Sequence, residues 1–164
     1  MAWVSLILVL LIICFSGVLI FGAPYLPTLS PQVQQALDMV DLKPGQTLLE
    51  LGAGDGKVLV AAAQRGIRVV GYELNPLLVI VCWLRTRRYR KLVTVRWGNF
   101  LTQPWPPANA IFIFGLQRIM PAVDKKVMQY SARPVKLVSF AFKIPGRKPL
   151  QTKGGLYLYE YREA

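Results

Sequence analysis

Histidine is absent from this sequence, and only two cysteines occur, Cys14 and Cys82. Structural zinc is held by four ligands, mostly Cys and His, so we expect no metal site. Both cysteines lie in apolar stretches, where an unpaired cysteine packs as a small hydrophobic residue. The sequence therefore points away from a zinc site and from a domain held together by disulfides.

Acidic residues are also scarce, because 8 Asp and Glu stand against 20 Lys and Arg, for a net charge of +12. No charged side chain of either sign precedes Asp38. A length of 164 residues leaves room for one compact domain. The chain thus divides into an uncharged, apolar N-terminal region and a strongly basic body.

The N-terminal region has the composition of a transmembrane helix. From Ala2 to Ala23 it is apolar apart from two serines. A helix over this segment would be about 33 Å long, enough to cross a hydrocarbon core of about 30 Å. Trp3 and Tyr25 suit the two membrane interfaces, and Pro24 ends the helix. We therefore expect one N-terminal transmembrane helix.

A cleaved signal peptide is the alternative for this segment, but it lacks a basic region before the apolar run. The body is basic and the N-terminal tail has no Lys or Arg, so the positive-inside rule predicts that the body faces the cytoplasm. The chain has no long presequence rich in Arg and Ser, which favours a prokaryotic inner membrane over an organelle membrane. The expected localisation is that of a single-pass membrane protein.

The basic body alternates strand-like and helix-like stretches, which is typical of a doubly wound α/β sheet. Ser30 and Pro31 open a first soluble helix. The expected strands are 47–51, 68–72, 94–97, 110–114, 135–142 and 156–161. The expected helices between them are 57–65, 76–91 and 121–132. The predicted fold is a Rossmann-like α/β domain preceded by one transmembrane helix.

A glycine-rich turn follows the first expected strand, with the sequence Glu50-Leu51-Gly52-Ala53-Gly54-Asp55-Gly56. Open α/β sheets bind ligands at this end of a strand, and glycines let the backbone turn sharply and approach a ligand closely. The Gly-x-Gly-x-Gly spacing differs from the Gly-x-Gly-x-x-Gly that seats a pyrophosphate. The two flanking carboxylates, Glu50 and Asp55, repel a phosphate and suit the ammonium and sulfonium groups of S-adenosylmethionine (SAM).

Two further elements stand at the ends of the next two strands. Glu73 ends the second strand, where an acidic side chain accepts hydrogen bonds from ribose hydroxyls, and Leu74 can cover the adenine. After the third strand, Asn99 can bind the adenine amine and Phe100 can pack on the ring. The candidate cofactor-binding residues are Glu50, Gly52, Ala53, Gly54, Asp55, Gly56, Glu73, Leu74, Asn99 and Phe100. A dinucleotide-binding domain and a fold without a ligand are the alternatives.

These motifs resemble those of the class I SAM-dependent methyltransferases. Together with the apolar N-terminal region, the segments 51–57, 71–76 and 113–121 resemble a small family of membrane-anchored protein lysine methyltransferases. That family includes the enzymes for the ATP synthase c-subunit and the adenine nucleotide translocase, with prokaryotic relatives. The resemblance covers roughly residues 1–161 and implies N-methylation of lysine on a membrane-associated protein. From composition and pattern we expect three regions: an anchor at 1–24, a connector with the first soluble helix at 25–46, and a methyltransferase domain at 47–164.

The end of the fourth strand faces the methyl group in this fold, so Phe114, Gly115 and Gln117 are the candidate substrate-side residues. No acidic residue occurs there, and the sequence identifies no catalytic base. The Asn/Asp-Pro-Pro-aromatic motif of nucleic-acid adenine methyltransferases is also missing, which disfavours nucleic acid as a substrate. A methyltransferase of a small or lipid-like molecule and a non-catalytic SAM-binding module remain alternatives.

A run of basic residues closes the longest expected helix: Arg85, Arg87, Arg88, Arg90 and Lys91. Cations at a helix C-terminus complement the helix dipole, and this effect alone explains the run without a further function. Attraction to anionic lipid head groups and binding of nucleic acid are the alternatives. The sequence alone does not choose among the three.

Overall fold

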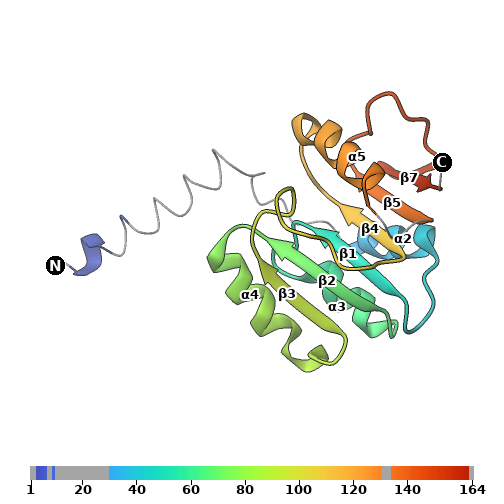
Figure 1. The fold of residues 1–164 in the computed structure, drawn as a ribbon. Coiled ribbons are helices and arrows are strands. Elements are labelled where there is room, and N and C mark those ends of the chain that lie inside the picture. Colours follow the sequence, from blue (N-terminus) through green and yellow to red (C-terminus); the bar gives the residue numbers. More distant parts are fainter. Residues whose placement is uncertain (1–2, 7–8, 10–29, 131–133, 163–164) are drawn as a thin grey trace.

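A seven-stranded sheet lies at the centre of the computed structural model, which describes residues 3–6, 9, 30–130 and 134–162 (Figure 1). Its strand order is β3-β2-β1-β4-β5-β7-β6. The strands are β1 (Thr47–Leu51), β2 (Arg68–Glu73), β3 (Val93–Trp97), β4 (Ala110–Ile113), β5 (Val135–Phe140), β6 (Gln151–Lys153) and β7 (Leu156–Tyr161). Strands β1 to β5 are parallel, and β7 pairs antiparallel to β5. The strand order reverses between β1 and β4, so ligands are expected at the carboxyl ends of these two strands.

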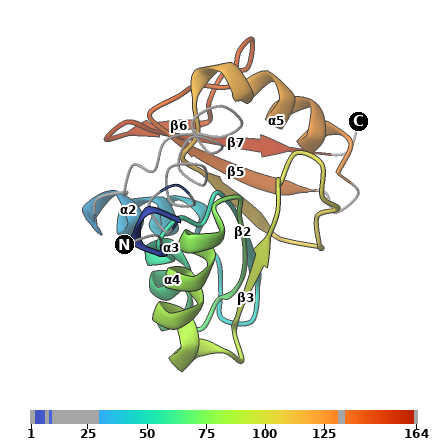
Figure 2. The same ribbon diagram turned by 90° about the vertical axis from the view of Figure 1, so that its left-hand side faces the viewer.

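Helices cover both faces of the sheet. They are α2 (Ser30–Val40), α3 (Lys57–Gln64), α4 (Pro76–Thr86) and α5 (Met120–Met128), with short 3₁₀ turns at Arg87–Tyr89 and Gln117–Ile119. Figure 2 shows α2, α3 and α4 grouped together and α5 apart from them. The first three helices contribute to one buried apolar cluster, and α5 contributes to a second cluster on the opposite face. The domain therefore has three layers.

The Rossmann-like α/β fold predicted from the sequence is confirmed, and all six predicted strands are present. The seventh strand, β6, was not predicted. It has three exposed residues and no apolar alternation, and it pairs with β7 across a Gly154-Gly155 turn. The predicted helix 76–91 is shorter than expected, because regular α-helix ends at Thr86 and a 3₁₀ turn follows.

The prediction of an N-terminal transmembrane helix is wrong for the residues that the structure describes. Within residues 3–6, 9, 30–130 and 134–162, no helix is both long and apolar enough to cross a membrane. The prediction rested on apolar composition, but a span needs a continuous helix of about 20 residues. Residues 3–6 and 9 are described as helical, and the rest of the predicted segment lies outside the described residues. A single-pass membrane protein facing the cytoplasm is accordingly not supported.

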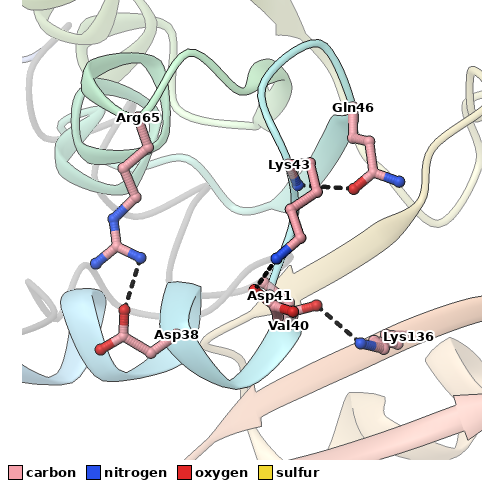
Figure 3. A network of polar contacts seen from close by, with 7 residues as sticks. All are labelled: Asp38, Val40, Asp41, Lys43, Gln46, Arg65 and Lys136. Atoms are coloured by element: carbon pink, nitrogen blue, oxygen red, sulfur yellow. Dashed lines mark hydrogen bonds and ion pairs between the residues drawn. The ribbon is translucent and has the colours of Figure 1, made fainter.

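Polar contacts fasten α2 to the α/β body (Figure 3). Arg65, just after α3, donates to Asp38 at 2.7 Å, and Lys136 Nζ donates to the carbonyl of Val40 at 3.0 Å. Val40 is the last residue of α2, where unpaired carbonyls and the helix dipole favour a cation. The Arg65–Asp38 pair is largely exposed and contributes little, whereas the partly buried Lys136 bond ties the end of α2 to β5.

We expect the variant Lys136→Met to lower the free energy of unfolding by about 1 kcal/mol, because the Val40 carbonyl loses its donor and the helix loses its C-terminal cation. Urea unfolding measures this change. Lys153→Met on the exposed strand β6 is the matched control, and we expect a change of less than about 0.5 kcal/mol. Equal effects of the two substitutions would contradict the role given to Lys136.

Candidate functional site

The glycine-rich turn joins β1 to α3 and is attached to the end of β2. The backbone N–H groups of Gly52 and Ala53 both donate to the carbonyl of Tyr72, at 3.0 and 2.7 Å. Gly52, Gly54 and Gly56 all have positive φ, at 94°, 54° and 79°. Side chains with a Cβ adopt this region only with strain, so the three predicted glycines are needed for the shape of the turn.

The two outer glycines of the turn face different surroundings. A Cβ on Gly56 would lie 2.7 Å from the Sγ of Cys82, so this glycine lets α4 pack against the turn. A Cβ on Gly52 would meet nothing within 4 Å, and Gly52 is exposed. The turn is therefore closed on the side of α4 and open at Gly52, where a ligand can approach the backbone.

Glu73 connects the end of β2 to the glycine-rich turn. Its Oε2 accepts a hydrogen bond from the N–H of Gly54 at 2.7 Å, and its Oε1 accepts one from the N–H of Asn75 at 2.8 Å. Asn75 in turn caps α4, because its side chain accepts from the N–H of Leu77. The carboxylate is buried, and each oxygen has a further lone pair with which to accept from a ligand.

Asp55 pairs with a cation that the sequence did not indicate. Arg85 of α4 forms an ion pair with the Asp55 carboxylate, whose other oxygen accepts from the N–H of Lys57 at 3.3 Å. The two partners of the ion pair are far apart along the chain and share no motif, so only the packing of α4 against the turn brings them together. The guanidinium of Arg85 thus offsets the negative charge of Asp55, whereas Glu50 has an oxygen without a hydrogen-bond partner.

Glu50 is the most deeply buried acid of the site, and its Oε2 has no hydrogen-bond partner. It stands on β1 opposite Phe112 of β4, on the sheet face covered by α3. Burial raises its pKa well above the ordinary value, and the nearby carboxylates of Glu73 and Asp55 raise it further. A cationic ligand placed here would satisfy the unpaired oxygen and offset the repulsion among the carboxylates.

The predicted adenine-side residues lie beside Glu73. The N–H of Gly98 donates to the Glu73 carbonyl at 2.9 Å, which brings the end of β3 to the end of β2. Asn99 uses its side-chain oxygen to accept from the N–H of Leu101, so it also shapes the following turn. Leu74 and Phe100 are both half-buried. The structure thus gathers the three predicted motifs at one edge of the sheet.

Lys126 of α5 supports the loop that follows β3, a contact that sequence reasoning missed. Its Nζ donates to the carbonyls of Phe100, Leu101 and Gln103, at 2.6, 2.8 and 2.6 Å. Burial lowers the pKa of this ammonium group. Because Lys126 is distant in sequence and lies in an ordinary helical pattern, no local signal marks it.

The substrate-side candidates follow β4 at the same edge. Leu51 pairs with Ile113, so Phe114 lies beside the start of the glycine-rich turn. The ring of Phe114 packs against Phe140 at the end of β5, with centroids 4.8 Å apart. Gln117 is exposed, and its amide donates to the carbonyl of Lys143 at 3.4 Å. Gly115 is buried, and a Cβ there would lie 2.8 Å from Ile119.

Metal binding and nucleophilic chemistry at cysteine both require particular residues in the described part of the chain. No group of three or more His, Cys, Asp or Glu is placed there to hold a metal ion. Cys82 is buried, and burial together with the neighbouring acids raises the pKa of its thiol to about 12. A thiol held in this protonated form is a poor nucleophile.

Sequence comparison identifies relatives of the whole site. Residues 50–151 match the family described as the ANTKMT methyltransferase domain. The mouse adenine nucleotide translocase lysine N-methyltransferase is 44% identical over 136 residues, covering 80% of this chain and 58% of that protein. The rat ATP synthase c-subunit lysine N-methyltransferase is 32% identical over 135 residues, covering 80% and 61%. The chain therefore spans less than two thirds of the length of these relatives.

Solved structures show the same fold. An RNA methyltransferase from Salinibacter ruber, in complex with S-adenosyl-L-homocysteine, has a TM-score of 0.79 at 24% identity, over 85% of this chain and 95% of that one. A SAM-dependent methyltransferase from Geobacter sulfurreducens, also in complex with S-adenosyl-L-homocysteine, has a TM-score of 0.58 at 20% identity, over 74% and 53%. At these identities the likeness concerns the fold, which is that of the class I methyltransferases.

The raised pKa of Glu50 predicts a pH-dependent stability. Between the ordinary and the raised pKa the folded protein holds a proton that the unfolded chain has lost, so stability falls as pH rises through this window. Glu50→Gln removes the titration. We expect the Tm of this variant to match that of the parent near pH 4 and to exceed it by roughly a few degrees at alkaline pH.

Thermal unfolding of the free protein across this pH range makes the measurement. Glu160→Gln on β7, where the carboxylate pairs with Arg162 at 2.7 Å, is the matched control. The Tm of this control should not rise relative to that of the parent as the pH increases. A constant difference for Glu50→Gln would show that burial does not disfavour the charged form of Glu50.

Proposed function

Because the chain belongs to the ANTKMT methyltransferase domain family, we propose that it transfers a methyl group from SAM to the side-chain amine of a lysine in a protein. Family membership confirms the predicted methyltransferase domain, and the predicted cofactor, SAM, agrees with the two similar solved structures in complex with S-adenosyl-L-homocysteine. The lysine acceptor is supported by the names of the relatives in mouse and rat. The observation that carries the proposal is the gathering of Glu50, Glu73 and the glycine-rich turn at one sheet edge.

The residues of this edge fit SAM. The unpaired Oε2 of Glu50 offers a buried acceptor to a cationic ligand, and the open side of Gly52 leaves room for a ligand against the backbone. We assign the methionine part of the cofactor to this turn, close to Glu50 and Asp55. When bound, SAM supplies an electrophilic methyl group on its sulfonium sulfur.

Glu73 is the proposed ribose-binding residue. Its two oxygens already accept from the N–H groups of Gly54 and Asn75, so its position is set before a ligand binds. Each oxygen can accept one more hydrogen bond, which is what two ribose hydroxyls require. Leu74, Asn99 and Phe100 extend this edge toward the adenine. Because backbone groups already hold the carboxylate, its side chain loses little conformational freedom when the ribose binds.

The proposed acceptor site lies at Phe114, Gly115 and Gln117. A lysine amine must be neutral to attack, and its ordinary pKa is about 10.4. Apolar surroundings lower the pKa of an amine, and the Phe114–Phe140 pair supplies such surroundings at the end of β4. Residues 114–120 contain no acid, so the chain's contribution is to hold the amine in line with the methyl group and to exclude water.

The substrate itself is proposed from the relatives. They are named for the ATP synthase c-subunit and for the adenine nucleotide translocase. We infer that this chain takes a lysine on a membrane-associated protein. We assign substrate contact to the loops around the ends of β4 and β5, because the Phe114 and Phe140 rings pack together there with centroids 4.8 Å apart.

SAM binding tests the cofactor site. We expect Glu73→Ala to weaken binding of S-adenosylhomocysteine by about tenfold or more, since a buried acceptor for the ribose is lost, as measured by calorimetry. An analogue of S-adenosylhomocysteine without the 2′ and 3′ hydroxyls separates loss of the ribose contact from a change in the glycine-rich turn. The parent should prefer the natural ligand, whereas Glu73→Ala should bind the two alike. A preference that survives in Glu73→Ala would place the ribose elsewhere.

Transfer of label tests the reaction. We expect the full chain, incubated with isolated membranes and radiolabelled SAM, to label a protein band, with methyl-lysine in its acid hydrolysate. Glu73→Ala should reduce the label in parallel with its SAM affinity, and Glu160→Ala should not. Label found only in the solvent extract would assign a small-molecule substrate. No label despite SAM binding would assign a binding module.

A further inference from the structure

Helix α4 exposes large apolar side chains on the face turned away from the sheet. Ile80, Val81, Trp83 and Leu84 are 55%, 42%, 63% and 49% exposed. The buried side chains of α4 are Cys82 and Thr86, which lie on the opposite side of the helix. A helix that is apolar on all sides is normally buried on all sides. The outward face of α4 is therefore a surface suited to contact with something apolar.

The C-terminal end of this face carries a concentration of positive charge. Residues 76–97 contain no Asp or Glu. The exposed cations that follow the apolar residues are Arg87, Arg88, Arg90 and Lys91. We call these four cations and the four apolar residues together the α4 surface. Helix α5 differs, because it has the charged residue Lys125 among its exposed positions.

A tryptophan extends the same region at the other end of the helix. Trp97 of β3 is 68% exposed, and its indole N–H donates to the carbonyl of Leu74, just before the N-cap of α4. Tryptophan with one polar contact and an exposed ring is the residue that proteins place at a membrane–water interface. Apolar side chains, an aromatic ring and a cluster of cations thus lie along one helix.

We propose that the α4 surface docks on an anionic lipid surface, with its apolar side chains at the boundary of the acyl chains and its cations on the head groups. This contact is peripheral and uses a helix of the folded domain, so it is distinct from a membrane-spanning segment. It goes beyond the proposed methyltransferase activity and does not require it.

Charge favours lipid over the other occupants. The N-terminal region of the chain before Asp38 has no charged side chain, so it cannot neutralise the cations of the α4 surface. A second copy would bring two like-charged clusters together on a protein of net charge +12. A nucleic acid would pair with the cations but would leave the apolar side chains of Ile80 and Leu84 exposed to water. An anionic lipid surface pairs with the cations and also covers the apolar side chains of the α4 surface.

The α4 surface is joined to the candidate functional site. Arg85 lies between the apolar residues and the cation cluster, and it pairs with Asp55 of the glycine-rich turn. The N-terminus of α4 follows directly on Glu73. Docking through α4 would therefore hold the site next to the lipid surface, which is where a lysine of a membrane-associated protein would be presented.

Sedimentation of the full chain with vesicles tests the proposal, using phosphatidylcholine alone or mixed with phosphatidylglycerol. The charge variant is Arg87→Gln/Arg88→Gln/Arg90→Gln, and its matched control is Lys125→Gln/Lys148→Gln/Lys153→Gln. The apolar variant is Ile80→Ser/Trp83→Ser, and its matched control is Met128→Ser/Leu150→Ser, at residues 52% and 65% exposed elsewhere. Arg85 is kept because of its pairing with Asp55.

We expect binding to the phosphatidylglycerol vesicles, weakened by added salt. The charge variant should lose affinity by on the order of 100-fold and the apolar variant by about tenfold, whereas the controls should change by less than about twofold. S-adenosylhomocysteine should bind all five proteins alike, which shows that each is folded and that the result does not depend on the proposed activity.

Three results would overturn the proposal. One is vesicle binding that both α4 variants retain in full. Another is a dimer that the apolar variant dissociates, which would assign the surface to a second copy. The third is binding of single-stranded nucleic acid that the charge variant loses and the apolar variant keeps, without any binding to vesicles.

Discussion

The buried carboxylate of Glu73 is the contact on which the candidate site depends. Through the N–H groups of Gly54 and Asn75 it joins the glycine-rich turn to the start of α4, and its own carbonyl accepts from Gly98 after β3. Three strand ends are thereby held in one arrangement by a single residue. A buried carboxylate is tolerated here because backbone donors satisfy it, and the same contacts fix its position for the ribose that we propose it binds.

The charge of the site is opposite to that of the molecule. On a chain of net charge +12, Glu50, Asp55 and Glu73 lie together around one turn. They are treated differently by their surroundings: Asp55 has Arg85, Glu73 has two backbone donors, and Glu50 has an oxygen without a partner. The SAM site that we propose at this turn would place a cationic cofactor beside these acids, where the opposite charge is favourable.

Helix α4 connects the candidate site to the proposed docking surface. Its inner face packs Cys82 against Gly56 of the turn, while its outer face presents apolar residues and cations. Under the two proposals, docking through α4 would hold the sheet edge beside a lipid surface and would restrict the lysines that reach it.

The sequence by itself determined the alternation of strands and helices, the glycine-rich turn and Glu73 at the end of β2. These follow from local rules, since glycine is needed at positive φ and apolar periodicity reports burial. Apolar composition alone was misleading at the N-terminus, where the predicted transmembrane helix is not supported by the described residues. Only the tertiary structure paired Arg85 with Asp55, placed Lys126 on the loop after β3 and left Glu50 without a partner. Each of these depends on which side chains meet across the packed layers, and no local pattern in the chain encodes that.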